Sequence, residues 1–200
     1  MPQVRRILDA RALPALADYE RAGGGRALEA ARAAEPAAVI DTVIAAGLRG
    51  RGGAGFPTGQ KWQTIVQQAE GRPVTLVVNA AEGEPGTLKD RTLLRRNPYQ
   101  VLEGALVAAH VVGGDRVIIG MKRSAGAERT RVEAAIAELD KAGWLQGTSV
   151  ECVATSDRYL VGEETALLEV VDGRPPFPRV APPYRAGVDG GHPVSLVNNV

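Results

Sequence analysis

Three short apolar runs, separated by amphipathic stretches of helical length, constrain the fold of this chain more than any other feature. The runs cover 74–79 (VTLVVN), 116–120 (RVIIG) and 149–154 (SVECVA), and apolar residues recur at helical spacing in 98–112 and 125–141. Strands that are apolar on both faces and alternate with helices predict an α/β fold with a mostly parallel sheet flanked by helices. Ligands of such sheets bind beyond the carboxyl ends of the strands, so the loop after Val78 is a natural place for a site.

The rest of the chain is interpreted from glycine and proline signals. Residues 1–35 predict an N-terminal helical lead, and the main domain covers 36–200. Pro36 opens a helix that Gly47 closes. Further helices are expected over 61–69 and 160–171, with a polar segment over 82–91. The proline-rich stretch beyond 171 predicts an extended, loop-like tail that adds nothing to the core.

Composition and charge exclude several classes of function. The chain has 24 basic and 23 acidic residues among 200, and only 4% aromatic residues, so nothing favours a nucleic-acid partner. No stretch has the length of a membrane span, and we expect a soluble, cytoplasmic protein. Cys152 is the only cysteine, and His110 and His192 show no metal-ligand spacing, so no metal site is expected. Cys152 itself is interpreted as a buried residue of a strand.

A glycine-dense segment over 47–62 (GLRGRGGAGFPTGQKW) is the strongest candidate for a binding site. Glycines let backbone N–H groups approach a ligand, and a helix that begins directly afterwards adds partial positive charge. Arg49, Arg51 and Lys61 add full charges, which favours a phosphate cradle over a mobile linker. The segment fits neither common design: the dinucleotide fingerprint should follow a strand, and the triphosphate loop needs Lys directly after its last glycine.

Four segments, in order, resemble the NADH-binding FMN flavoprotein subunit of respiratory complex I and related subunits of NAD-linked hydrogenases and formate dehydrogenases. They are the glycine segment, 79–91 (NAAEGEPGTLKDR), 159–167 (YLVGEETAL), and the stretch from Pro178-Arg179 to Asn198-Asn199-Val200. Four ordered motifs are far more specific than one glycine pattern. The resemblance covers roughly residue 41 to the end and implies a Rossmann-like FMN-binding domain.

The resemblance also implies roles for individual residues. The flavin pocket would be lined by Gly50, Arg51, Gly52, Gly53, Ala54, Gly55, Lys61, Asn79, Glu82, Tyr159, Gly162, Glu163, Glu164, Asn198 and Asn199. Phe56 and Glu84 would lie where NADH docks, and Lys61, Glu82 and Glu84 would orient and tune the reacting groups. The implied function is hydride transfer from NADH to FMN, with electrons passed to an iron–sulfur, thioredoxin-like or ferredoxin-type acceptor subunit.

Three positions depart from the family pattern and keep alternatives open. Ala81 replaces an aspartate, Thr64 an aromatic residue and Ala181 a lysine. One alternative is therefore an electron-transfer module that holds FMN but does not use NADH. Others are a non-flavin nucleotide or sugar-phosphate binder, and a hydrolase that uses the glutamate pairs of the two acidic segments. The family continues into a ubiquitin-like domain and a domain with a 4Fe–4S cluster. The sequence is therefore expected to be either a fragment of a longer protein or a stripped flavin module, and its end inside a binding motif favours the fragment.

Overall fold

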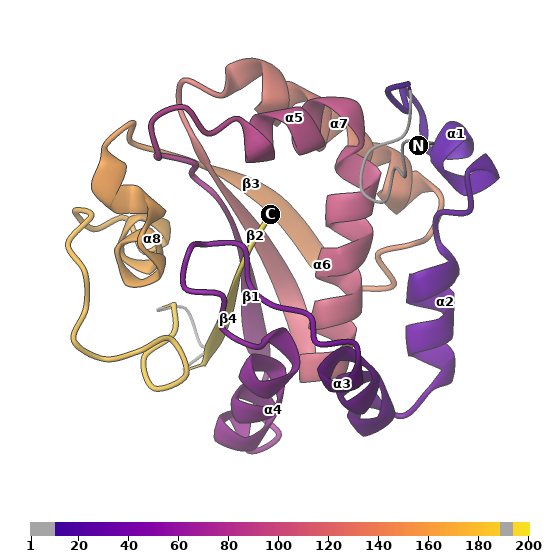
Figure 1. The fold of residues 1–200 in the computed structure, drawn as a ribbon, viewed down its shortest axis with the longest axis horizontal. Helices are drawn as coiled ribbons and strands as arrows, with labels where there is room; N and C mark the ends of the chain where they lie inside the picture. The colour runs from indigo at the N-terminus through magenta and orange to yellow at the C-terminus, as the bar shows by residue number, and fades with distance from the viewer. Residues whose placement is uncertain (1–10, 189–193) are drawn as a thin grey trace, which may run out of the picture.

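A computed structural model describes residues 11–188 and 194–200, and its centre is a four-stranded parallel sheet (Figure 1). The strands are β1 (Val74–Ala80), β2 (Gly114–Lys122), β3 (Ser149–Thr155) and β4 (Ser195–Asn199), in the order β3-β2-β1-β4. All three strand pairs are parallel. The α/β fold with a parallel sheet flanked by helices is therefore confirmed. The first ten residues of the N-terminal lead, and His192, lie outside the described residues.

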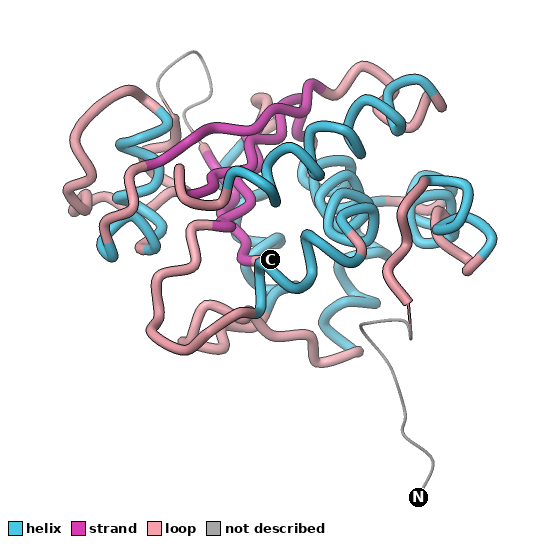
Figure 2. The backbone as a smooth tube through the Cα atoms, turned by 90° about the horizontal axis from the view of Figure 1, so that it is seen from above, coloured by secondary structure: helices cyan, strands magenta, loops and turns pink. Residues whose placement is uncertain are grey.

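The two faces of the sheet are covered by different parts of the chain. Every residue of β1 is buried, and its side chains alternate between two separate hydrophobic clusters. Leu76 and Val78 belong to the larger cluster, which includes residues of the helices before β3, whereas Val77 packs with Leu167 and Leu168 of the last helix. Figure 2 shows helices on both sides of the strands. A strand with two buried faces and a hydrogen-bonded neighbour on each side suits a continuous apolar run.

The helices begin and end near the predicted residues in most cases. They are α1 (Leu16–Arg21), α2 (Arg26–Ala33), α3 (Pro36–Ala45), α4 (Thr58–Ala69), α5 (Lys89–Arg96), α6 (Pro98–Val112), α7 (Gly126–Lys141) and α8 (Glu164–Val171), with a 3₁₀ turn, η1, over Tyr159–Gly162. Gly47 and Gly113 follow α3 and α6 with φ of 63° and 73°, the left-handed conformation expected after a helix. Residues 16–33 form two helices, because Gly23 and Gly25 also adopt positive φ and interrupt the chain between them.

The prediction of a loop-like C-terminal tail is wrong for its last residues. Ser195–Asn199 forms β4, and Leu196 and Val197 are 0% and 3% exposed. The prolines upstream end before this run, and β4 pairs with β1 from Thr75–Ser195 to Asn79–Asn199. Strand β4 thereby supplies hydrogen-bond partners to the side of β1 that β2 leaves unpaired, which the proline count concealed.

Two helix predictions also need correction. The polar segment expected over 82–91 overlaps α5, a helix in which Asp90 and Leu94 are the buried residues. The single helix expected over 160–171 is divided, because Glu163 adopts an extended conformation (φ −76°, ψ 136°) between η1 and α8. The helix expected from Lys61 begins at Thr58, so Gly59 belongs to α4 rather than to a loop.

Candidate functional site

The carboxyl ends of the strands gather most of the predicted site residues at one edge of the sheet. The predicted residues Asn79, Asn198 and Asn199 lie at the ends of β1 and β4. Lys122, which was not predicted, lies at the end of β2. Strand β1 connects onward to β2 on one side and pairs with β4 on the other, so the chain reverses direction across the sheet at β1. In open parallel sheets such a reversal leaves a crevice beyond the strand ends where ligands bind.

The glycine loop (residues 48–58) is closed by its own backbone. Gly50 N donates to Phe56 O at 2.9 Å, Thr58 N donates to Leu48 O at 2.9 Å, and Arg49 Nη1 donates to Gly55 O at 3.1 Å. Gly53 and Gly55 adopt φ of 103° and 62°, which other residues rarely do. Arg49 and Arg51 are both exposed, but Arg49, which was expected to supply charge to a ligand, is engaged with the loop itself. The loop is a preformed turn directly before α4.

Gly52 brings the glycine loop against the end of β4. A Cβ atom at Gly52 would lie 2.3 Å from Asn199 Nδ2, a distance that real contacts do not allow. The neighbouring Asn198, in the amide orientation that satisfies its hydrogen bonds, accepts from Trp62 Nε1 of α4 at 3.0 Å. The two asparagines therefore tie the strand, the loop and the helix together at the sheet edge.

Glu163 and Asn79 organise the opposite side of the edge. Glu163 caps α8, because its carboxylate accepts from Thr165 N at 3.0 Å and Ala166 N at 2.8 Å. Asn79 Nδ2 donates to Gly162 O at 2.8 Å, and Asn79 Oδ1 accepts from Ala81 N at 3.1 Å. Asn79 thereby holds the segment that precedes α8 close to the end of β1, and Glu163 fixes the start of α8. The sequence pattern did not reveal either role.

Lys61 and Glu164 meet across the carboxyl edge. Lys61 comes from α4 and Glu164 from α8, two helices whose buried residues belong to different hydrophobic clusters, yet Nζ and Oε2 are 2.7 Å apart. The side chains are 28% and 39% exposed, so solvent screens the pair and its contribution to stability is small, at most about 1 kcal/mol. Its importance is positional: it places one charge of each sign beside the glycine loop.

Tyr159 and Glu84 form a second polar contact over the same edge. Tyr159 OH donates to Glu84 Oε1 at 2.5 Å, and this hydrogen bond raises the pKa of the Tyr159 hydroxyl. Tyr159 is 61% exposed and Phe56 of the glycine loop is 54% exposed. Large aromatic surfaces left in water beside a crevice are suited to stacking against a planar ligand.

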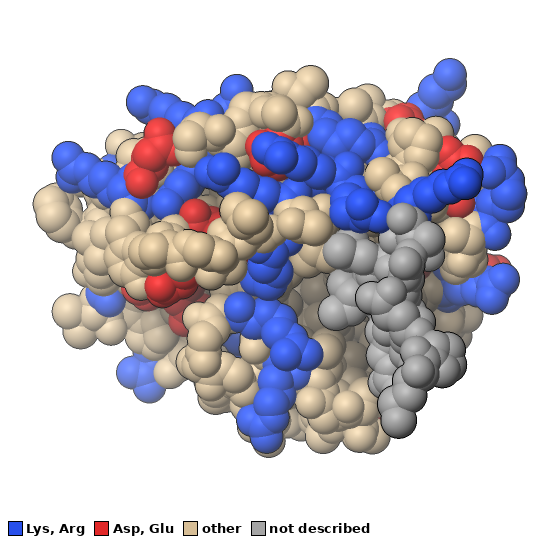
Figure 3. Space-filling view, turned by 45° about the horizontal axis from the view of Figure 1, so that its top comes forward, with Lys and Arg blue, Asp and Glu red and all other residues tan. Residues whose placement is uncertain are grey.

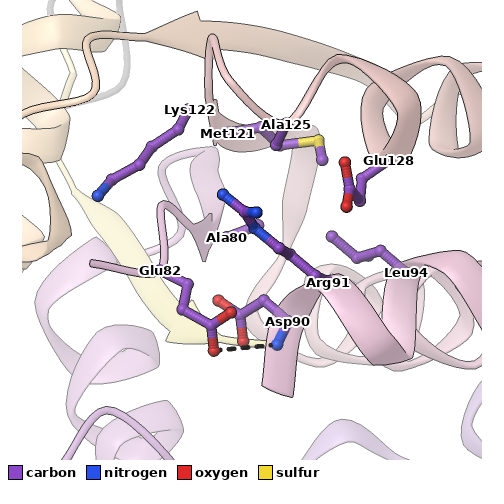
Figure 4. A pocket seen from close by; sticks show the side chains of 9 residues that line it. All are labelled: Ala80, Glu82, Asp90, Arg91, Leu94, Met121, Lys122, Ala125 and Glu128. Atoms are coloured by element: carbon purple, nitrogen blue, oxygen red, sulfur yellow. Dashed lines mark hydrogen bonds between the residues drawn. The ribbon is translucent and has the colours of Figure 1, made fainter. Parts of the chain in front are cut away.

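A small pocket between β2, α5 and α7 holds charged groups whose partners are incomplete (Figure 4). Glu82 Oε1 accepts from Asp90 N at 3.2 Å, but among the described residues the buried Glu82 Oε2 has no hydrogen-bond partner. Asp90 is paired with Lys89 at 2.5 Å, and burial raises the pKa of its carboxyl group. Lys122 is 9% exposed and has no ion-pair partner in the described parts of the chain.

Lys122 is the functional candidate that sequence reasoning missed. It lies at the end of β2, two residues beyond the predicted strand 116–120. A charged residue directly after a buried strand of a parallel sheet lies at the ligand-binding edge, and that signal was present in the sequence.

The residues at the three positions that depart from the family pattern have small side chains. Ala81 is fully buried, and Thr64 Oγ1 donates to Gln60 O of its own helix at 3.0 Å. Ala181 lies in the loop after α8, beside Val180, which is fully exposed.

Basic side chains gather on the face drawn in Figure 3, the side on which α5 lies, and α5 alone carries four cations and one acid.

Two features are absent from the described residues. Over residues 11–188 and 194–200, no group of three or more His, Cys, Asp or Glu side chains is arranged to hold a metal ion. Within the same ranges, no helix has the length and apolar character needed to cross a membrane.

Comparison with known proteins places the chain in a family. Residues 43–200 match the family described as "Nuo51 FMN-binding domain". One relative belongs to the NADH-quinone oxidoreductase of Rhodobacter capsulatus and is 42% identical over 170 residues, which are 81% of this chain and 39% of the relative. Another belongs to an NADH-quinone oxidoreductase of Rhizobium meliloti and is 39% identical over 194 residues, 92% of this chain and 46% of the relative.

A solved structure shows the same fold. An NAD+-reducing NiFe-hydrogenase in the H2-reduced state matches with a TM-score of 0.77 and 39% identity, over 86% of this chain and 30% of the hydrogenase chain. The chain therefore spans less than half the length of these relatives. With a family match that covers most of its residues, this chain belongs to the Nuo51 FMN-binding domain family.

Proposed function

We propose that this chain is the FMN-holding redox domain of an NADH dehydrogenase-type oxidoreductase. The observation that carries the proposal is the convergence of four groups on one carboxyl edge of the sheet. They are the closed glycine loop, Asn199, the half-buried Glu82 with its unpaired Oε2, and the buried Lys122. The relatives that belong to NADH-quinone oxidoreductases support it, because they match this chain over 81% and 92% of its length.

The residues present fit FMN in three respects. The absence of a side chain at Gly52 lets the loop backbone lie against the Asn199 amide, and glycines allow backbone N–H groups to approach a ligand phosphate. The exposed guanidinium of Arg51 and the start of α4 favour negative charge there. The buried Glu82 Oε2 calls for a hydrogen-bond donor, which a ribityl hydroxyl or a ring N–H supplies.

The remaining site residues bind and orient the reactants. Lys61 and Glu164 hold charges of opposite sign beside the loop, and Tyr159 and Glu84 close the edge above β1. Phe56 offers an exposed ring to a second planar group, the nicotinamide nucleotide. When bound, FMN accepts a hydride from NADH and releases electrons singly, and no side chain of this site needs to act as an acid or base in the transfer.

The partner and the setting follow from the same proposal. The electrons pass to an iron–sulfur subunit or to a cluster-bearing part of a longer protein, because a single cysteine cannot hold a cluster here. Within this chain, the proposed FMN-binding domain covers residues 36–200, and α1 and α2 belong to the lead that precedes it. The assembly works on the cytoplasmic side, peripheral to a membrane complex.

Reconstitution with FMN followed by anaerobic addition of NADH tests the proposal. We expect the full chain to bind FMN, which quenches flavin fluorescence, and NADH to bleach the visible absorbance of the bound flavin. NADPH and reduced nicotinamide mononucleotide serve as matched donors that separate recognition of the nucleotide from chemical reduction. A folded protein that ignores FMN contradicts the proposal.

A second function is favoured by the missing side chains at Thr64, Ala81 and Ala181. Without a large aromatic residue, a carboxylate and a cation at these positions, contact area and charge for a nucleotide are lost. The alternative is a module that holds FMN but receives electrons from another donor. Bound flavin that dithionite reduces and NADH leaves oxidised is the result this alternative requires.

A further inference from the structure

We propose that Lys122 is the cation that acts on the ring end of the bound flavin and raises its reduction potential. The inference rests on the proposed function, because it assumes that FMN lies along the carboxyl edge of the sheet. It assigns a role to a residue outside the motifs that carry the family resemblance.

Lys122 carries a buried positive charge that no ion pair in the described chain balances. Lys122 is 9% exposed, and no carboxylate of the described residues forms an ion pair with it. The neighbouring acids have other contacts: Asp90 pairs with Lys89 and Glu128 with Arg95, at 2.5 and 2.6 Å. Burying a lysine without a partner is costly and rare, so a partner from outside the chain is indicated.

Other charged groups lie near Lys122. Asp157 lies within electrostatic range, but its Oδ1 accepts from Ser124 N at 3.0 Å, and contacts with Ser124 are the main cause of its lowered pKa. Arg91 and Glu82 line the same pocket, and Figure 4 shows the Arg91 guanidinium and Lys122 on the side of the pocket where the Glu82 loop lies. Within the part of the chain that the structure describes, Lys122, Arg91 and Glu82 of this pocket form no ion pair, whereas its other two acids, Asp90 and Glu128, pair with Lys89 and Arg95. Counted with these two partners, the charged groups at the pocket carry one more positive than negative charge.

Lys122 lies at the ring end of the proposed FMN site rather than at its phosphate end. The glycine loop, the expected phosphate site, touches Asn199 at the end of β4, whereas Lys122 ends β2, and β1 lies between them. Two strand spacings separate the two sites, about 10 Å, and the ribityl chain of FMN can span that distance. A Cβ atom at Gly83 would lie 3.1 Å from Lys122 Nζ and 3.3 Å from Tyr159 Cδ2, so both side chains lie against the backbone of Gly83.

The chemical consequence follows from charge balance. A hydride brings two electrons and one proton from the nicotinamide to the flavin, so the ring gains one negative charge until a second proton arrives. A nearby cation shielded from water favours the negatively charged form over the neutral one, by about tenfold or more when it lies within ~4–6 Å. Lys122 therefore binds the reduced ring more tightly than the oxidised ring, which raises the potential.

Potentiometric titration of bound FMN in Lys122→Met and Lys122→Gln tests the inference. We expect reduced FMN to lose at least about tenfold in affinity relative to oxidised FMN, which for a two-electron couple lowers the midpoint potential by about 30 mV. Lys122→Arg should restore most of the potential. Lys141→Met, at the exposed end of α7, removes the same charge at a distance and should leave the potential unchanged.

The ratio of FMN affinity to riboflavin affinity distinguishes the ring from the phosphate. This ratio should be the same in Lys122→Met as in the unaltered chain, because the phosphate is held elsewhere. A collapsed ratio would make Lys122 a phosphate ligand and overturn the inference, as would an unchanged potential in both neutral variants. If the unaltered chain itself fails to bind FMN, the proposed function has failed rather than this inference alone.

Discussion

The contact between Gly52 and Asn199 decides how closely the glycine loop approaches the sheet. Because a Cβ atom at position 52 would lie 2.3 Å from Asn199 Nδ2, a side chain there must displace either the Asn199 amide or the loop itself. We expect Gly52→Val to weaken FMN binding by about 10- to 100-fold, the loss of one or two hydrogen bonds to a charged phosphate. Fluorescence titration with FMN gives the dissociation constant.

A matched variant separates this effect from a general loss of stability. Gly104 lies in α6 with no atom within 4 Å of its Cβ position. Gly104→Val should therefore bind FMN as the unaltered chain does. Equal FMN affinity in Gly52→Val and Gly104→Val would show that the glycine loop is not part of the binding site.

The thiol of Cys152 is expected to react slowly in the folded chain. Burial in β3, with a further contribution from Glu133, raises the pKa of its thiol to about 12. At pH 8 only about one thiol in 10⁴ is then a reactive thiolate. We expect a thiol reagent to label the folded chain far more slowly than the chain unfolded in urea. Rapid labelling without denaturant would show that β3 opens or that the thiol is activated.

The residue scale also shows where sequence reasoning ends. The glycine loop, Glu82 and Glu84 could be located from motifs, but not the way that Arg49 and Asn79 are engaged by the protein itself. Lys122 was missed because a charged residue after an apolar run is usually interpreted as solvent-exposed. In the folded chain Lys122 is 9% exposed, and its ammonium group lies against the backbone of Gly83.

At the scale of elements, apolar patterning located the strands that are buried on both faces and failed where packing alone decides. Strands β1, β2 and β3 were predicted because their apolar runs stand out from amphipathic neighbours. Strand β4 follows a proline-rich stretch, and its five residues become a strand by pairing with β1. Helix α5 has one buried leucine, Leu94, which is too few apolar residues for a periodic signal.

Helix α4 packs closely against α3 at Gly59. A Cβ atom at Gly59 would lie 2.5 Å from Ile44 Cγ1 and 3.2 Å from Ile40 O, so α4 must move away from α3 to admit it. Gly59→Ala should destabilise the chain by about 1–3 kcal/mol, although alanine favours helices more than glycine does. Urea unfolding measures the change.

The exposed glycine of α6 provides the control for helix propensity. Gly104→Ala meets no atom within 4 Å and should stabilise the chain by up to about 1 kcal/mol. Opposite signs for two Gly→Ala changes in helices would identify close packing as the reason for glycine at position 59. A stabilising Gly59→Ala would mean that α3 and α4 pack less closely than described.

At the scale of the whole molecule, one buried carboxylate joins the N-terminal helices to the α/β core. Glu103 of α6 is 4% exposed and accepts from Tyr19 OH at 2.5 Å, Gly25 N at 2.9 Å and Leu28 N at 3.0 Å. These donors come from α1, from the turn between α1 and α2, and from α2 itself. Residues 16–33 should therefore unfold together with the sheet.

Glu103→Leu tests this coupling, because it leaves three donors without an acceptor. We expect a loss of about 2–4 kcal/mol in the free energy of unfolding. Hydrogen exchange should rise first at the amides of α1 and α2, while β1 and β2 keep their protection. Glu20→Leu, at an exposed position of α1, changes the same residue type and should cost less than about 0.5 kcal/mol. If the unaltered chain unfolds in two separate steps, with α1 and α2 lost in the first, then Glu103 does not couple the lead to the core and residues 11–35 behave as an independent unit.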